Sequence, residues 1–298
     1  MGAQIISGTE AAREIRDKVA EQVRQVREEN GRVPGLATVL VGEDSASQSY
    51  VRMKNRDAEE VGFRSRQIDL PSSISEHELL GWVEGLNVDP DIHGILVQLP
   101  LPRQISEERI VAAIDPKKDV DGFNPVNVGR LSAGDPDVLA PCTPGGIVEL
   151  LVRGGHDPEG RHVVIVGRSK IVGRPMAALL LSRGRGGNAT VTVAHSRTAD
   201  LPAVTRLGEI LIVAVGSPGL VTAEMVHPGA VVIDVGVNRV EDPSSEKGYR
   251  LTGDVDFDSV KEVASAITPV PGGVGPMTRA MLLSNTLAAY VSEKGVGV

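Results

Sequence analysis

The sequence is poor in aromatic residues and in cysteine, and it has no long apolar run. Phe, Trp and Tyr together make up 2% of the 298 residues, so the core must be built from Val, Leu, Ile and Ala. The single cysteine, Cys142, excludes an internal disulfide and a metal site made of several cysteines. No apolar stretch reaches the length of a membrane span, and the first ten residues lack the basic and apolar regions of a secretory signal. We therefore expect a cytoplasmic protein with no membrane partner.

The chain also lacks a basic excess. Its formal net charge of −8 argues against a nucleic acid or an anionic membrane as partner, because both select basic surfaces. The six histidines show no metal-ligand spacing, so no metal site is expected. Cys142 has no neighbouring histidine, which favours a structural cysteine over a nucleophile. The length, the 41% of hydrophobic residues and the 23% of charged residues suit two globular domains or one large α/β unit.

Helix and strand patterns alternate along the whole chain. Apolar residues at helical spacing predict a first helix that ends near Gly31, and short runs rich in Val, Ile and Leu predict strands. The predicted strands are 36–41, 65–70, 93–99, 162–166, 190–194, 210–215 and 231–235. The predicted helices that follow the first are 45–62, 75–86, 106–114, 144–153, 173–183 and 277–293. The segment 115–146 shows no periodicity, which indicates a long functional loop.

This alternation predicts the fold class. Continuous apolar strands that alternate with helices are typical of parallel sheets covered on both faces, and we find no internal repeat. We therefore expect two α/β domains that divide near residue 144. The first comprises residues 1–143 with 278–298, and the second comprises residues 144–277.

The second predicted domain carries a candidate nucleotide site. The strand at 162–166 leads into Gly167, Arg168 and Ser169, and Gly173 opens the next helix. Glycines at such a turn let the backbone approach a pyrophosphate at a helix N-terminus, as in a Rossmann-like domain. The spacing is Gly-x5-Gly and not Gly-x-Gly-x-x-Gly, and a purely structural turn would use glycines too.

The end of the following strand favours NADP over NAD. An NAD site has a carboxylate there to hold the ribose 2′-hydroxyl. Here the strand is followed by polar residues without a carboxylate, namely His195, Ser196 and Arg197. Arg168, Ser196 and Arg197 are suited to a 2′-phosphate, because guanidinium groups pair well with phosphate oxygens. Gly216 and Gly236 follow two further strands and are expected along the same crevice, near the nicotinamide.

The first predicted domain offers the candidate reactive residues. Tyr50 and Lys54 lie four residues apart, on one face of a predicted helix. A lysine shielded in an apolar cleft has a lowered pKa and can act as a general base or position a water, whereas a helix lysine can also be simply solvated. Gln98 ends an apolar strand, where an amide needs a hydrogen-bond partner unless the strand end is solvated. Asp121 lies in the long loop, where it is either solvated or held in a pocket, able to accept two N–H bonds from a guanidine-like ring edge.

Six motifs, taken in order along the chain, resemble those of one known family. They are Ser49-Tyr50-Val-x-x-Lys54, Gly94-Ile-Leu-Val-Gln98-Leu-Pro-Leu-Pro102, Lys118-Asp-Val-Asp121-Gly-Phe123, Pro141-Cys-Thr-Pro144-Gly, Gly167-Arg-Ser169-x-x-Val-Gly-x-Pro175 and Ile267-Thr-Pro-Val-Pro271-Gly-Gly-Val-Gly275-Pro-Met277. The chain resembles, from end to end, the bifunctional methylenetetrahydrofolate dehydrogenase/methenyltetrahydrofolate cyclohydrolase family. The resemblance implies an α/β catalytic domain to which the last helix returns, a Rossmann-like NADP-binding domain, a cleft between them that binds folate, and a homodimer.

The resemblance also implies the chemistry and the residues. It implies NADP-dependent oxidation of 5,10-methylenetetrahydrofolate to the 5,10-methenyl cation, then hydrolysis to 10-formyltetrahydrofolate, within one-carbon metabolism and purine biosynthesis. Lys54 is then the catalytic residue that activates water, Gln98 tunes it, Tyr50 stacks on the folate and Asp121 anchors the pterin. Further implied folate contacts are Val97, Leu99, Pro271, Gly272, Gly273, Val274 and Gly275. The implied NADP contacts are Gly167, Arg168, Ser169, His195, Ser196, Arg197 and Val237.

Three other functions fit parts of the sequence. The chain could be a monofunctional methylenetetrahydrofolate dehydrogenase. It could be another two-domain NADP dehydrogenase that resembles shikimate dehydrogenase and uses Lys54 as acid and base. Such an enzyme has no role for the Gln98 motif or for the Gly/Pro loop at 271–276. It could also be a nucleotide-sensing module on the same fold, against which the joint presence of Lys54, Gln98 and Asp121 argues.

Overall fold

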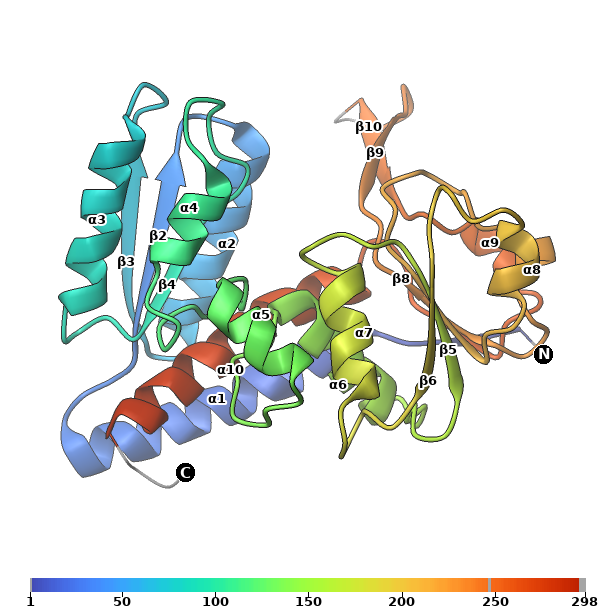
Figure 1. Ribbon diagram of the computed structural model, residues 1–298, viewed down its shortest axis with the longest axis horizontal. Coiled ribbons are helices and arrows are strands. Elements are labelled where there is room, and N and C mark those ends of the chain that lie inside the picture. Colours follow the sequence, from blue (N-terminus) through green and yellow to red (C-terminus); the bar gives the residue numbers. More distant parts are fainter. Residues whose placement is uncertain (1, 246–247, 295–298) are drawn as a thin grey trace. The chain divides into compact units, whose positions relative to one another are not determined.

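The computed structural model describes residues 2–245 and 248–294, which form two compact units (Figure 1). Of these residues, unit 1 comprises 2–12, 143–245 and 248–278, and unit 2 comprises 13–142 and 279–294. The chain passes from one unit to the other within or next to three helices, α1 (Gly8–Asn30), α6 (Cys142–Arg153) and α10 (Val274–Lys294). The prediction grouped residues 1–12 with unit 2. The structure differs, because β1 (Gln4–Ile5) pairs with β11 (Ala266–Ile267) at the edge of the sheet of unit 1.

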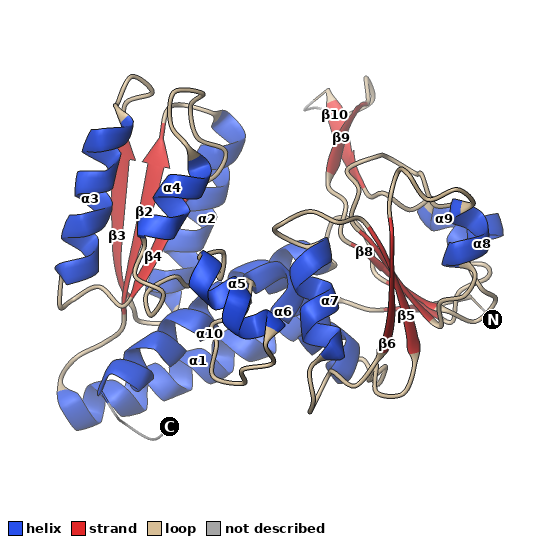
Figure 2. Ribbon diagram, viewed as in Figure 1, coloured by secondary structure: helices blue, strands red, loops and turns tan. Residues whose placement is uncertain are grey.

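Unit 2 is built on a three-stranded parallel sheet with strand order β3-β2-β4 (Figure 2). Its elements, besides α1 and α10, are β2 (Gly35–Val41), α2 (Ser45–Glu60), β3 (Arg64–Leu70), α3 (Glu76–Val88), β4 (Gly94–Val97), α4 (Glu107–Ala113) and α5 (Pro125–Ser132). Alternate residues of β2, such as Ala37 and Val39, pack in one core cluster with Leu79 of α3 and Ile110 of α4. Thr38 points to the other face, where its hydroxyl donates a hydrogen bond to Asn55 of α2 (2.9 Å). Helices therefore cover both faces of this sheet.

Unit 1 is built on a six-stranded parallel sheet with strand order β1-β11-β8-β7-β5-β6. Its further elements are β5 (His162–Val166), α7 (Gly173–Leu181), β6 (Thr190–Ala194), α8 (Leu201–Thr205), β7 (Ile210–Val213), the 3₁₀-helix η1 (Ala223–Met225), β8 (Val231–Asp234), β9 (Asn238–Glu241), β10 (Tyr249–Thr252) and α9 (Phe257–Val260). In this unit α7 lies on one side of the sheet and α8 and α9 on the other (Figure 1). The chain runs outward from β5 to β6 and then crosses back to β7, so the strand order reverses between β5 and β7. Open α/β sheets bind their ligands at such a switch point.

The long helices α1 and α10 have 23 and 21 residues. In α1, buried Ile15, Val19 and Val23 recur at helical spacing among exposed charged residues, which is the pattern of a helix that packs on one side. Within the described residues, no helix is both long enough and apolar enough to cross a membrane.

The predicted helices and strands are present, with their ends shifted by a few residues. The prediction was wrong for the segment 115–146, which contains α5 and the first turns of α6. Helix α5 starts after Asn124, whose side chain accepts a hydrogen bond from Val126 N (2.8 Å), and Pro125 takes its first position. A capped helix of two turns is too short to show a periodic pattern. The prediction also missed short elements, namely β1, α8, η1, β9, β10, α9 and β11.

Candidate active site

Helix α2 places Tyr50 and Lys54 on the same face, one turn apart. It begins after Asp44, whose carboxylate accepts a hydrogen bond from Ser47 N (2.7 Å). Lys54 is only 5% exposed, and its Nζ lies 4.8 Å from the centroid of the Tyr50 ring. Lys54 is therefore the shielded lysine of the prediction, and the alternative of a solvated lysine is wrong.

Gln98 lies directly beyond the last residue of β4. Its backbone N–H donates to Val39 O (2.9 Å), which extends the pairing with β2 by one residue. Its side-chain Nε2 donates to Leu99 O (2.7 Å), and its Oε1 accepts a hydrogen bond from Lys54 Nζ (3.1 Å). Because both ends of the amide are engaged, its oxygen is fixed toward the lysine. The expectation that Gln98 points at a polar partner is confirmed.

The loop that carries Asp121 runs beside β4. Ile95 N donates to Lys118 O (2.8 Å), and a parallel bridge joins Ile95 to Asp119. The buried Asp119 carboxylate accepts hydrogen bonds from Asn124 N (2.8 Å) and Asn127 Nδ2 (2.9 Å), so it holds the loop in shape. Asp121 is half-buried, and its charge acts on both Tyr50 and Lys54.

Burial and the Asp121 charge set the electrostatics of this cluster. Burial lowers the pKa of Lys54, and the charge of Asp121 opposes that shift only in part. Burial together with Asp121 raises the pKa of Tyr50 to about 12, so the phenol keeps its proton at neutral pH. Burial and Asp121 also raise the pKa of the Cys142 thiol well above its ordinary value. The thiol donates to Val120 O (3.1 Å), in line with a structural cysteine that stays protonated.

The cluster therefore presents four functional groups on adjacent elements of unit 2. They are an amine whose pKa is lowered by burial, an amide oxygen aimed at it, a phenol ring and a carboxylate. A neutral amine in such surroundings can accept a proton from water or hold a water in place. Within the described residues, no group of three or more His, Cys, Asp or Glu side chains could hold a metal ion.

In unit 1 the predicted cofactor residues gather at the carboxyl edge of the sheet. Gly167 follows β5 with φ +128°, and a Cβ on it would lie 2.2 Å from Ala214 O. A Cβ on Gly173 would lie 2.2 Å from Gly167 O, so both positions require glycine for close backbone packing. The Ser169 hydroxyl accepts hydrogen bonds from Val172 N (3.1 Å) and Gly173 N (3.4 Å) and shapes the turn into α7. This turn lies at the switch point between β5 and β7.

The residues predicted to hold a 2′-phosphate lie on the next strand end. Val166 of β5 pairs with Ala194 of β6, and both are the last residues of their strands. The turns that follow the two strands therefore start side by side. Arg168, Ser196 and Arg197 are exposed, and Arg197 N donates to His195 Nδ1 (3.1 Å). Two exposed guanidinium groups on adjacent strand ends form a cationic edge that suits phosphate oxygens.

Two buried carboxylates that sequence reasoning missed hold the glycine turns after β7 and β8. Asp254 accepts hydrogen bonds from Val215 N (2.7 Å), Gly216 N (2.9 Å) and Ser217 N (2.8 Å). Asp234 accepts from Gly236 N (3.0 Å) and from Asp254 N (2.9 Å), and burial raises its pKa to about 6. The signal in the sequence was weak, because Asp254 binds an amide 39 residues away and Asp234 binds one 21 residues away. Val237, the remaining predicted cofactor residue, follows the second of these turns and is exposed.

The predicted folate loop Pro271–Gly275 belongs to unit 1 in its entirety. It packs against the start of α1: Thr9 N donates to Gly272 O (3.1 Å), and a Cβ on Gly8 would lie 1.7 Å from Gly273 O. Gly272 has φ +104°, a conformation that glycine adopts without strain. The structure thus brings Tyr50, Lys54, Gln98 and Asp121 together in unit 2, with Val97 and Leu99 flanking Gln98, and places the loop in the other unit.

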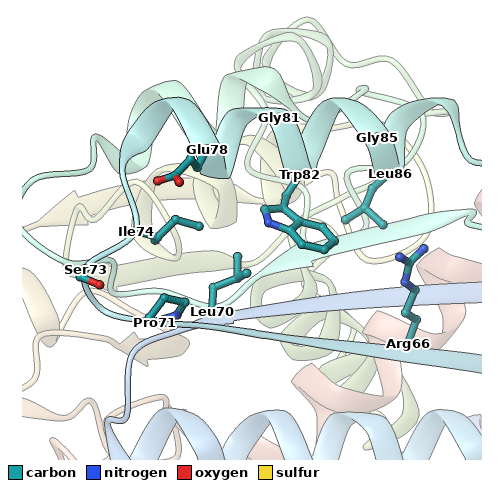
Figure 3. A pocket seen from close by; sticks show the side chains of 10 residues that line it. All are labelled: Arg66, Leu70, Pro71, Ser73, Ile74, Glu78, Gly81, Trp82, Gly85 and Leu86. Carbon is teal, nitrogen blue, oxygen red and sulfur yellow. The ribbon is translucent and has the colours of Figure 1, made fainter.

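A surface pocket of about 710 Å³ lies elsewhere in unit 2, between α3 and the strand β3 (Figure 3). Its lining includes the half-exposed Trp82 with Leu70, Arg66 and Glu78. None of the predicted site residues contributes to it.

Comparisons with known proteins identify the family of the chain. Two family profiles match the chain: the tetrahydrofolate dehydrogenase/cyclohydrolase catalytic domain over residues 6–121, and the NAD(P)-binding domain of the same family over residues 141–294. The bifunctional protein FolD of Prosthecochloris aestuarii is 54% identical over 96% of this chain and 97% of its own length. The FolD of Syntrophobacter fumaroxidans is 55% identical over 97% of both chains.

A solved structure with the same fold is that of the Trypanosoma brucei N5,N10-methylenetetrahydrofolate dehydrogenase-cyclohydrolase, complexed with NADP and an inhibitor. It is 42% identical, covers 99% of each chain and superposes with a TM-score of 0.93. Both family profiles and relatives of this similarity span nearly the whole chain. The chain belongs to the tetrahydrofolate dehydrogenase/cyclohydrolase family.

Proposed function

We propose that the cluster of Tyr50, Lys54, Gln98 and Asp121 is the folate site of a bifunctional enzyme and that Lys54 is its catalytic centre. As a family member, the protein is an NADP-dependent methylenetetrahydrofolate dehydrogenase and methenyltetrahydrofolate cyclohydrolase. It oxidises 5,10-methylenetetrahydrofolate to the 5,10-methenyl cation and hydrolyses that cation to 10-formyltetrahydrofolate. The observation that carries the residue assignment is the 3.1 Å hydrogen bond from the buried Lys54 amine to Gln98 Oε1.

The role of Lys54 follows from its charge state. The methenyl substrate of the second step is a cation, so an ammonium group beside it would be repelled. Burial lowers the pKa of Lys54 and favours the neutral amine, which can take a proton from the water that attacks the methenyl carbon. Gln98 fixes the direction of the amine, because its own Nε2 is bound to Leu99 O.

The remaining residues of unit 2 bind the substrate in this proposal. Tyr50 offers an aromatic face for stacking, and its phenol stays neutral because burial and Asp121 raise its pKa. Asp121 accepts two N–H donors from the guanidine-like edge of the pterin. Val97 and Leu99 flank Gln98 at the end of β4, and we assign them to the walls of the same site. We assign folate binding to unit 2, joined by the unit 1 segment of Pro271, Gly272, Gly273, Val274 and Gly275.

We assign NADP binding to the carboxyl edge of the sheet in unit 1. NADP bound there would supply the acceptor for the hydride that the methylene carbon loses. The turn at Gly167–Ser169 lies at the strand-order switch, and glycine at 167 avoids the collision that a Cβ would make with Ala214 O. Arg168, Ser196 and Arg197, with His195, would meet the 2′-phosphate, and Val237 would lie beside the bound cofactor. The exposed arginines on adjacent strand ends support NADP over NAD.

Three finer inferences rest on the family resemblance. We infer that the protein forms a homodimer, acts in the cytoplasm and supplies a formyl donor for purine biosynthesis. Sedimentation of the purified protein tests the first of these directly, because a monomer at micromolar concentration would refute it.

An absorbance assay tests the proposed function. Methylenetetrahydrofolate is offered with NADP or with NAD, and both NADPH and the methenyl intermediate are followed. We expect NADP-dependent reduction followed by decay of the methenyl signal above the rate in buffer. Reduction with a persistent methenyl signal would leave a dehydrogenase alone, and no turnover with either cofactor would refute the assignment.

A further inference from the structure

A buried ion pair lies one turn beyond Lys54 on α2. Asp57 Oδ2 is 2.9 Å from Arg279 Nη1 of α10, and the two side chains are 3% and 15% exposed. Tyr50, Lys54 and Asp57 occupy positions i, i+4 and i+7, so they line one face of the helix. The ion pair therefore continues the face that carries the proposed folate-site residues.

The pair leaves hydrogen-bonding capacity unused. A guanidinium group has five N–H donors, and Asp57 is the partner found for Arg279 within residues 2–245 and 248–294. Although the two atoms are close, neither Asp57 Oδ2 nor Arg279 Nη1 forms an aligned hydrogen bond with a described residue. A buried ion pair with incomplete hydrogen bonding contributes little to stability, because the desolvation of both charges opposes it. Stability alone therefore does not explain why the pair is there.

Three arginines and one glutamate act on the charge of Asp57. The charges of Arg279, Arg16 and Arg56 all act on it, and Glu60 opposes them. Arg56 pairs with Glu60 (3.4 Å) on the exposed side of α2, and these two largely cancel. Arg279 and Arg16 then stand against the single Asp57 carboxylate, whose pKa is raised by its burial. Arg279 and Arg16 are therefore the cations that act on the buried carboxylate from outside α2, and both could pair with an anion.

We propose that Arg279, held by Asp57 and joined by Arg16, binds the glutamate carboxylates of the folate substrate. This inference rests on the proposed function, in which the p-aminobenzoyl ring stacks on Tyr50. The glutamate is attached to that ring through an amide and carries its carboxylates away from the reacting carbon. Asp57 lies seven residues beyond Tyr50, about 10 Å along the helix axis. An extended benzoylglutamate has the length to reach the guanidinium group from the ring.

Two further observations support the assignment. The charge of Arg279 acts on Tyr50 as well as on Asp57. The guanidinium group is also planar and always charged, which suits the paired oxygens of a carboxylate. The glutamate is remote from the reacting carbon, so these contacts stabilise the bound substrate and the transition state equally. They lower the KM for the substrate and leave kcat unchanged.

Two substrates and three variants test the inference. The substrates are 5,10-methylenetetrahydrofolate and the corresponding tetrahydropteroate, which has the same reacting carbon and no glutamate. The variants are Arg16→Ala, the double variant Asp57→Ala with Arg279→Val, and the control Arg64→Ala. The double variant removes both charges of the buried pair, so no unpaired charge is left in the core. Arg64 is an exposed arginine with an ion pair of its own to Asp91, outside the proposed site.

We expect the double variant to raise the KM for the glutamate-bearing substrate roughly tenfold, the loss of about one charge-assisted contact. Arg16→Ala should raise it less. The KM for the pteroate substrate and both kcat values should match those of the wild type, and Arg64→Ala should change none of them. An unchanged KM for the folate, or an equal rise for both substrates, would overturn the inference.

The same comparison is made by calorimetric titration of the two ligands. The binding constants decide the inference independently of turnover, whereas a wild-type protein that binds both ligands and turns over neither would refute the proposed function alone.

Discussion

Replacing Lys54 by methionine removes the amine from the candidate active site and changes the side-chain volume little. The lysine is 5% exposed, and its hydrogen bond to Gln98 Oε1 is the polar contact that the substitution breaks. The apolar methionine fits surroundings that already disfavour a charge, since burial lowers the pKa of Lys54. Folate binding through Tyr50 and Asp121 is expected to remain.

The expected loss of hydrolysis follows from the role of a general base. Such a group contributes about 10²- to 10⁴-fold to a rate, which corresponds to about 2.7–5.4 kcal/mol of activation free energy. We therefore expect Lys54→Met to slow the enzyme-catalysed decay of added methenyltetrahydrofolate by at least two orders of magnitude. Methenyl absorbance measured against a buffer blank gives this rate, and unchanged hydrolysis would refute the role of the amine.

The same variant makes a prediction about stability. The lowered pKa of Lys54 in the folded state means that, between that pKa and 10.5, the unfolded chain binds a proton that the folded chain does not. The stability of the wild type therefore falls as the pH drops from 10.5 through this window, and the full cost is present below the folded-state pKa. Lys54→Met removes the cost, so the variant should unfold at higher urea concentration than the wild type at pH 7. That advantage should shrink as the pH approaches 10.5. A variant less stable at pH 7, with an intact fold by circular dichroism, would contradict the lowered pKa.

Three further predictions follow from neighbouring residues. Gln98→Glu places a carboxylate against the Lys54 amine and should raise the pKa of Lys54. The acid limb of the pH profile of hydrolysis should then move to higher pH. An unchanged acid limb would show that residue 98 does not influence the pKa of Lys54. Arg168→Ala combined with Arg197→Ala should raise the KM for NADP about 10- to 100-fold, because each charge-assisted hydrogen bond contributes about 1.5–3 kcal/mol. The KM for NAD should rise much less. Equal effects on both cofactors would refute the 2′-phosphate assignment. Asp254→Ala leaves three backbone N–H groups without their acceptor. The free energy of unfolding, measured by urea titration, should fall by about 3 kcal/mol or more. A loss below about 1 kcal/mol would show that other acceptors replace the carboxylate.

Much of the fold could be predicted because its signals are local. Buried parallel strands such as β5 and β7 are continuous apolar runs, and helices such as α2 show their spacing within a few turns. Tyr50 and Lys54 could be placed on one face from their separation alone. Gln98 was conspicuous because an amide in an apolar strand needs a partner, and the structure provides that partner in Lys54.

The parts that escaped prediction depend on contacts between distant segments. β1 has two residues and forms only because it meets β11, more than 250 residues away, so no local pattern marks it. Asp254 looks like a loop carboxylate and Asp234 like a polar strand end until the folded chain brings amide groups to them. The ion pair of Asp57 with Arg279 joins two helices from opposite ends of the chain, and neither residue stands out in its own segment.

In the proposed mechanism a neutral Lys54 activates the water that opens the methenyl ring. The most direct measurement is a titration of the Lys54 side chain in the folded enzyme by ¹³C NMR of labelled lysine, with the signal assigned by its absence in Lys54→Met. The pH dependence of methenyl hydrolysis is measured on the same preparation. We predict a Lys54 pKa below 10.5 that coincides with the acid limb of the hydrolysis rate. A Lys54 pKa at or above 10.5, or a hydrolysis rate that does not follow its titration, would contradict the claim.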